Sequence, residues 1–228
     1  DAANAGTVTF NASGALDADT TASVTGATGV SMASGSTITS DGDTDLTATN
    51  GNIALGEISA TGQTVTLAAN QGSIYDNNGN TNNVTAATLD ATAQNLIGEV
   101  NDAETDAVGD LDLATAVIVT PSDAIETAVS TANATITQAN GDIAIDNTNA
   151  GGLNIATIQP DTDGSADMWV RNSNSLTVTN WTTTDGDNIS LIATASDLTI
   201  PNDNIAGGAG TADAGVIAND GNIENIDL

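Results

Sequence analysis

The side chains best placed for chemistry are aspartates grouped around glycine turns. The clearest group is Asp161, Asp163 and Asp167, which occupy positions one, three and seven of a segment that bends at Gly164. Calcium binds six to eight hard oxygens, and closely spaced carboxylates on such a bend can provide several of them. A complete calcium loop closes with a bidentate glutamate at position twelve, where this chain has Asn172. The spacing therefore predicts a partial calcium site, with solvated turn acids as the alternative.

Two shorter sets of closely spaced aspartates also occur beside glycine turns between the apolar runs. The chain has a formal net charge of −29, so its carboxylates repel one another unless cations screen them. Bound calcium would relieve that repulsion, and no other cofactor is expected. The candidate metal ligands outside the first group are Asp41, Asp43, Asp45, Asp185 and Asp187.

The composition excludes most other site chemistry. The 228 residues include 30 Asp and Glu, a single basic residue, Arg171, and no histidine or cysteine. The chain therefore lacks an imidazole base, a thiolate nucleophile, a lysine for a Schiff base, and the usual ligands of zinc, copper and haem. Its charge repels nucleic acids and anionic lipid surfaces, so neither is expected as a partner. No stretch approaches the roughly 20 apolar residues that span a bilayer, so membrane insertion is not expected either.

The acidic turns are separated by very short runs in which apolar residues alternate with small polar ones. Alternation with a period of two is typical of strands that have one face in a core and one in water. Runs this short cannot bury their apolar face alone, so they need copies stacked above and below. The predicted strands are 7–10, 22–25, 30–32, 37–39, 45–47, 52–55, 64–67, 73–75, 134–137, 142–145, 153–155, 167–170, 175–178, 188–192 and 197–200.

The spacing of these runs indicates the fold class. Three successive runs make a turn of about twenty residues, and the phrase Gly-[Asn/Asp]-Ile recurs at Gly51, Gly141 and Gly221. We therefore predict an all-β fold, a parallel β-helix with about twenty residues per coil. Asp-Gly and Asn-Gly pairs between the runs are also strong hairpin signals, so an antiparallel β-sandwich of immunoglobulin-like repeats is the alternative. Sandwich strands, however, are usually longer and richer in aromatic residues.

One segment breaks the rhythm. Residues 97–112 are acidic and lack the alternation, so we expect an irregular insertion there within a single elongated domain that covers residues 1–228. After Pro121, Ser122 could cap a short helix that extends to Val129, and another coil is the alternative. At about 4.8 Å per coil, the chain would form about eleven coils and a rod of roughly 50 Å.

Two stretches carry a family resemblance. Residues 51–76 have the sequence GNIALGEISATGQTVTLAANQGSIYD. They resemble the repeats of filamentous-haemagglutinin-type exoproteins, which are large bacterial adhesins of the two-partner-secretion kind. The coils of those proteins have the form G-x-I-x-L, V-x-L-x-A and G-x-I. Residues 121–158, PSDAIETAVSTANATITQANGDIAIDNTNAGGLNIATI, are similar to a second phrase of these proteins, in which a Pro-Ile-Glu-Thr-type turn precedes G-D-I-x-I and G-L-x-I. The resemblance implies a right-handed parallel β-helix in a rod-shaped, secreted or surface-exposed molecule.

Proteins with β-helices also include polysaccharide hydrolases and lyases, but a catalytic role is not expected here. A hydrolase needs two carboxylates about 5 to 9.5 Å apart across a cleft, and acidic pairs arise by chance in this chain. A lyase that abstracts a proton with Arg or Lys would depend on Arg171, which we expect to pair with a nearby aspartate. Trp169 and Trp181 could stack on sugar rings, although covering the core is the more common use of tryptophan in a thin coil.

Together these patterns predict a structural rod at the bacterial cell surface or outside the cell. It would be a segment of a large adhesin or exoprotein, or a subunit of an extracellular filament assembled head to tail. Neither end of the sequence resembles a cap, so we expect copies of the chain, or adjoining repeats of a longer one, to stack on it. A host or cell-surface glycan is a further candidate partner. The alternatives are a calcium-binding surface-layer or adhesin module and a polysaccharide-active enzyme.

Overall fold

The computed structural model describes residues 2–4, 6–99, 111–112, 117–118, 123–138, 141–159, 167–182, 188–199, 205–206, 214–218 and 223–224. All regular elements in these ranges are β-strands. In chain order they are β1 (Ala2–Asn4), β2 (Thr7–Phe10), β3 (Ala15–Ala18), β4 (Ala22–Gly26), β5 (Gly29–Met32), β6 (Thr37–Ser40), β7 (Thr44–Ala48), β8 (Ile53–Leu55), β9 (Glu57–Ala69), β10 (Ile74–Asp76), β11 (Val84–Ala93), β12 (Leu111–Asp112), β13 (Val117–Ile118), β14 (Ile125–Ala128), β15 (Thr131–Ile136), β16 (Ile143–Asn147), β17 (Leu153–Gln159), β18 (Asp167–Asn172), β19 (Leu176–Val178), β20 (Trp181–Thr182), β21 (Asn188–Ala193), β22 (Leu198–Thr199), β23 (Ile205–Ala206), β24 (Ala214–Ala218) and β25 (Ile223–Glu224).

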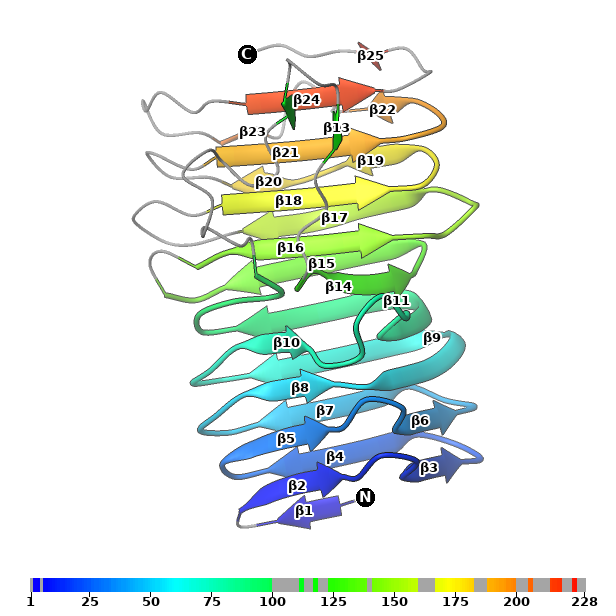
Figure 1. Ribbon diagram of the computed structural model, residues 1–228, viewed down its shortest axis with the longest axis vertical. Coiled ribbons are helices and arrows are strands. Elements are labelled where there is room, and N and C mark those ends of the chain that lie inside the picture. Colours follow the sequence, from blue (N-terminus) through cyan, green and yellow to red (C-terminus); the bar gives the residue numbers. More distant parts are fainter. Residues whose placement is uncertain are drawn as a thin grey trace.

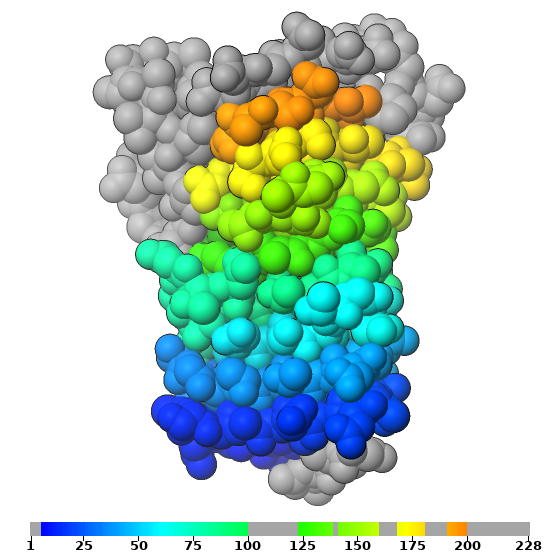
Figure 2. All heavy atoms as spheres, turned by 90° about the vertical axis from the view of Figure 1, so that its right-hand side faces the viewer, coloured from blue at the N-terminus to red at the C-terminus, as the bar shows by residue number. Residues whose placement is uncertain are grey.

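Successive turns of the chain lie directly on one another. β4 pairs with β7 and β7 with β9, both in parallel, which places Val24 beside Leu46 and Leu46 beside Leu67. β2, β5, β8 and β10 form a second ladder, and β3, β6 and the first residues of β9 form a third. In Figure 1 the nearer strands, such as β16, β18 and β21, run to the right, the farther strands run back, and the chain climbs, so the coil is right-handed. Figure 2 shows the same order as layers from blue to orange.

The pairing confirms the predicted β-solenoid. Among the described strands, only β12 and β13 form an antiparallel ladder, so the alternative β-sandwich is wrong. Equivalent positions lie roughly 22 residues apart, and the stack has about 7 turns. The estimate of about eleven coils, made from about twenty residues per coil, was therefore too high.

The ladders pass directly from β11 to the strands that follow Asp123. β11 pairs directly with β14 and β15, so Leu89 lies beside Ala132. Ile97 likewise bridges Ile74 on one side and Ile143 on the other. The predicted insertion at 97–112 falls largely outside the described residues. The helix considered as one alternative after Ser122 is wrong where the structure describes it, because residues 125–128 form strand β14.

The core is a single apolar column inside the coil. Buried and half-buried residues alternate along β4 and β7, as a period of two requires. Val24 and Leu46 are fully buried, and burial of each such side chain contributes roughly 1.5–3 kcal/mol relative to exposure. The first turn contributes Val8, Phe10, Leu16 and Ala18, which pack against this core while remaining partly exposed.

The recurring Gly-x-Ile phrase has a steric cause. In the described part of the chain, Gly51, Gly72 and Gly141 belong to this phrase, and each lies two residues before a core isoleucine, against the backbone of the turn below. A Cβ on Gly51 would lie 2.1 Å from the carbonyl oxygen of Thr28, and one on Gly72 would lie 2.4 Å from that of Gly51. A Cβ on Gly141 would likewise lie 2.1 Å from the carbonyl oxygen of Asn95. Only glycine lets successive corners approach this closely.

Candidate functional site

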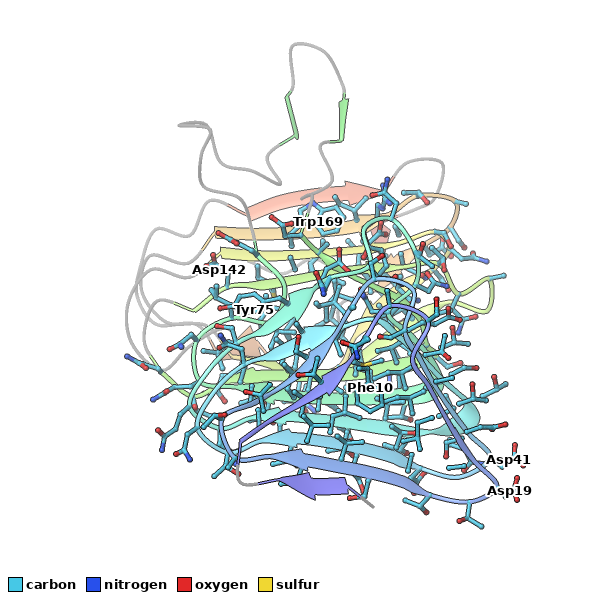
Figure 3. All side chains as sticks on the ribbon, turned by 60° about the horizontal axis from the view of Figure 1, so that its bottom comes forward. Phe10, Asp19, Asp41, Tyr75, Asp142 and Trp169 are labelled. Carbon is cyan, nitrogen blue, oxygen red and sulfur yellow. The ribbon has the colours of Figure 1, made fainter. Side chains whose placement is uncertain are left out.

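The predicted calcium ligands are only partly covered by the described residues. Asp161, Asp163, Asp185 and Asp187 lie outside them, and Asp167 is described as the first residue of β18 without its side chain. In the remaining set, Asp41 and Asp43 are exposed in the turn between β6 and β7, and Asp45 is half-buried on β7. Figure 3 shows Asp41 beside Asp19 at a corner of the rod. These calcium ligands remain a prediction.

One acid of this set, Asp43, has a structural contact. The Oδ1 atom of Asp43 accepts a hydrogen bond from the backbone N–H of Thr64, one turn further along, at 2.9 Å. Within the ranges whose side chains are described, no group of three or more acidic, histidine or cysteine side chains is gathered closely enough to hold a metal ion. The aspartates at 41, 43 and 45 are therefore not brought together as one ligand cluster.

A different polar cluster, which the sequence patterns did not single out, lies where the chain re-enters the stack. We call it the lateral cluster and define it as Asp76, Asn83, Glu126, Asp146 and Arg171. Three of these residues are aligned by strand register, with Glu126 on β14 beside Asp146 on β16, and Asp146 beside Arg171 on β18. Their neighbours along the strands, such as Ile125, Ile145 and Val170, belong to the main core. Because side chains alternate across a strand, the lateral cluster lies on the outer face of these strands.

Arg171, the only basic residue of the chain, is bound within this cluster. Its Nε donates to Oδ1 of Asp146 at 2.8 Å, and its Nη2 forms an ion pair with Oδ2 of the same carboxylate. The guanidinium also lies 5.6 Å from the ring centroid of Trp169, within cation–π range. The expectation that Arg171 pairs with an aspartate is confirmed, and the partner is 25 residues away in sequence.

Asn83 joins two acidic residues of the cluster. Its Nδ2 donates to Oδ1 of Asp76 at 2.7 Å, and its Oδ1 accepts the backbone N–H of Glu126 at 3.0 Å. The backbone N–H of Asn83 also donates to the carbonyl oxygen of Glu126 at 2.7 Å. Asp76 further accepts the N–H groups of Asn78 and Gly79, at 2.7 and 2.9 Å. The side chain of Asp76 therefore closes the turn after β10.

Glu126 is the chemically unusual member. It is 8% exposed, and its Oε2 atom is buried without a hydrogen-bond partner. Burial, together with the nearby carboxylates of Asp76 and Asp146, raises the pKa of Glu126 to about 8, although Arg171 acts in the opposite direction. Glu126 is therefore mostly protonated at neutral pH. No short sequence motif marks it, because its acidic neighbours lie on other turns.

Trp169 covers the outside of the sheet rather than offering a platform for sugars. It is fully buried and belongs to a small apolar cluster with Ala124, Ala144 and Ile192, separate from the main core. Its Nε1 atom is buried without a hydrogen-bond partner. The expected covering role thus holds for Trp169. The side chain of Trp181 lies outside the description, which covers only its backbone in β20.

The corner after the lateral cluster is closed by buried amides. Oδ1 of Asn147 accepts hydrogen bonds from the hydroxyl of Thr127 at 2.8 Å and from the N–H of Val129 at 2.9 Å. Nδ2 of Asn147 donates to the carbonyl of Val129 and to Oδ1 of Asn172, at 3.1 and 2.9 Å. Asn172 in turn donates to the carbonyl of Ser175 at 2.5 Å. These buried amides hold three neighbouring turns together at one corner.

No helix in the described ranges is long and apolar enough to cross a membrane.

Comparison with known proteins adds no relative. No family model, curated protein or solved structure matches the chain, so its resemblance to filamentous-haemagglutinin-type repeats rests on the quoted sequence phrases alone.

Proposed function

We propose that this protein is a structural β-solenoid rod, part of a large bacterial adhesin or exoprotein or of an extracellular filament. The observation that carries the proposal is the stack of parallel strands that runs from β1 to β25, β12 and β13 excepted, with one apolar column formed by its described core residues from Val8 to Leu198. In a stack of this kind each turn contacts only the turns directly above and below it. Each added turn therefore lengthens the molecule along one axis, and the result is a stiff, extended rod.

The proposed assembly follows from the same contacts. Each turn binds the next through parallel backbone hydrogen bonds and stacked apolar side chains, as in β4, β7 and β9. A further turn, from an adjoining repeat or from a second copy stacked head to tail, would be bound by the same groups. The proposal places the rod at the cell surface or outside the cell. Its net charge of −29 would keep neighbouring rods apart and exclude nucleic acids as partners.

The proposal assigns no catalytic step to the chain. Arg171 is held by Asp146 and is not free to act as a base. Incubation with a panel of neutral and anionic polysaccharides is expected to produce no new chain ends. A glycan array under the same conditions tests the separate proposal that the rod binds a host or cell-surface glycan.

Negative-stain electron microscopy of the purified chain tests the rod directly. We expect elongated particles or fibres whose length grows when the sequence is duplicated in tandem. Circular dichroism of the same sample should show strand without helix. Compact particles whose longest dimension does not change on duplication would overturn the proposal.

A calcium-binding module is the second candidate. It is favoured by the repetition of exposed aspartates at a corner, where Asp41 lies beside Asp19 (Figure 3). Carboxylates repeated along a corner of the stack raise the local concentration of divalent cations. In this proposal calcium screens the acidic corners and does not take part in a reaction.

A further inference from the structure

The lateral cluster lies at a joint in the stack. Below the joint, β11 ends the regular series of turns, and above it β14 is the first strand after the chain returns at Asp123. The two sides are tied at this point by the hydrogen bonds that Asn83 makes with the backbone of Glu126, at 2.7 and 3.0 Å. Glu126 is therefore positioned where the two halves of the coil meet.

Among the described residues, the charges around Glu126 come from three other elements. Asp76 ends β10, Asp146 lies beside Glu126 on β16, and Arg171 lies beside Asp146 on β18. Two of the guanidinium nitrogens, Nε and Nη2, bind Asp146. An ionised Glu126 would therefore be a third carboxylate beside a single cation, with its Oε2 atom buried and unpaired.

We propose that Glu126 is a protonation switch for this joint, closed when its carboxyl group is neutral and locally opened when that group is ionised. A buried, unpaired carboxylate is costly, and like charges in register on neighbouring strands add repulsion. The cost is relieved when water reaches Oε2, and in this proposal the opening lies at the contact between Asn83 and the backbone of Glu126. Burial, together with the nearby carboxylates, raises the pKa of Glu126 to about 8, which places the transition within reach of mildly alkaline conditions.

The opening is expected to stay local. β11 is also held to β15 over six register pairs, from Thr88 beside Thr131 to Ala93 beside Ile136. That ladder is backed by fully buried core residues such as Ala93 and Ile136. The apolar column therefore holds the two halves together while the outer edge of the joint responds to pH.

The test combines a direct titration with a measurement of opening. The protein is labelled with carboxyl carbon-13 glutamate, and its five glutamates are followed by NMR from pH 4 to pH 10. Amide exchange at residues 83–85 and 125–128 is measured over the same range, with the amides of β4 and β7 as an internal reference. The proteins compared are the wild type, Glu126→Gln, and Glu57→Gln as a matched control on β9.

We expect one glutamate to titrate near pH 8 and to be missing in Glu126→Gln. Between pH 7 and pH 9, protection of the joint amides relative to the reference should fall about tenfold in the wild type and in Glu57→Gln, and not in Glu126→Gln. Titration of every glutamate below pH 6, or the same loss of protection in Glu126→Gln, would overturn the proposal. If Glu126→Gln does not fold, the loss of protection in the wild type must level off at the pH where the shifted glutamate titrates. A loss that continues unchanged above that pH would overturn the proposal.

Discussion

The Nδ2 group of Asn147 donates a hydrogen bond to Oδ1 of Asn172, its register partner on the next turn, at 2.9 Å. Both side chains are fully buried at the corner that ends β16 and β18. Because the hydroxyl of Thr127 binds the same amide from the turn below, three turns are joined at one corner. Side-chain amides thus satisfy polar groups where the chain leaves one ladder and has not yet entered the next.

Replacing Asn147 with alanine is expected to lower the free energy of unfolding by about 2 to 3 kcal/mol, because it leaves the carbonyl of Val129 and the hydroxyl of Thr127 without partners. Urea unfolding followed by circular dichroism measures the change. Asn70→Ala, at an exposed position, is the control and should change stability by less than about 0.5 kcal/mol. Equal shifts in the two variants would show that the corner amides do not stabilise the stack.

Arg171→Met is expected to destabilise the fold by about 2 to 4 kcal/mol, because Asp146 would remain buried without its partner. The double variant Arg171→Met/Asp146→Leu removes both charges and should recover most of the loss. Unfolding midpoints of the two single variants and the double variant complete the cycle. A double variant that is less stable than Arg171→Met would contradict this account.

Stability should depend on pH through Glu126. Its pKa is raised from 4.5 to about 8 in the folded protein, so the folded state binds the proton more tightly. The resulting stabilisation is fully present below pH 4.5 and is lost as pH rises through about 8. Between pH 6 and pH 8 the free energy of unfolding should fall by at most about 1.4 kcal/mol per pH unit.

The matched measurement is urea unfolding of Glu126→Gln at pH 6 and pH 8. This variant carries no ionisable group at position 126, so its stability should be nearly flat across that interval. Glu57→Gln should keep the wild-type slope. A slope in Glu126→Gln as steep as that of the wild type would assign the pH dependence to another group.

Gly51→Ala is expected to cost about 1 to 3 kcal/mol, because the added Cβ would lie 2.1 Å from the carbonyl oxygen of Thr28 and the turns would have to separate. Gly151→Ala is the control, since the nearest atom to its Cβ is 3.4 Å away. Thermal unfolding of both variants distinguishes this steric effect from a general effect of replacing glycine. Similar melting temperatures would argue against a tight corner at Gly51.

Calcium removal tests the second candidate function. If carboxylates of the acidic turns bind calcium, excess chelator should lower the melting temperature by several degrees and added calcium should restore it, because a ligand that binds only the folded state stabilises it. Magnesium at the same ionic strength is the control for simple screening. Asp161→Asn and Asp41→Asn then locate the site. An unchanged melting curve after chelation would remove calcium from the proposal.

Most of the strands could be predicted from local pattern, and the two clearest misses have a physical reason. β3 and β11 were not predicted, although β11 is 10 residues long. β3 offers one large apolar residue, Leu16, and several inward positions of β11 are alanines such as Ala91 and Ala93. Alanine is a weak strand former, so these segments become strands because the turns above and below them supply pairing partners.

The candidate site could not be predicted in the same way. Its members were visible as ordinary acidic, amide and basic residues, but their contacts span up to 43 residues, as between Asn83 and Glu126. That separation is about twice the usual spacing of roughly 22 residues although β11 and β14 are paired directly, so counting coil lengths misplaces Glu126. Burial, which is the largest cause of its raised pKa, also depends on the packing of other turns.

By itself the sequence determined the architecture and the limits of the chemistry. Alternating apolar residues and corner glycines such as Gly51 are local requirements of a parallel coil, and the absence of histidine and cysteine needs no structure to recognise. The tertiary structure alone decided which turn stacks on which, and hence that Asp76, Glu126, Asp146 and Arg171 share one lateral cluster. The reason is that register is set by cooperative packing along the whole stack, whereas composition and periodicity are properties of short segments.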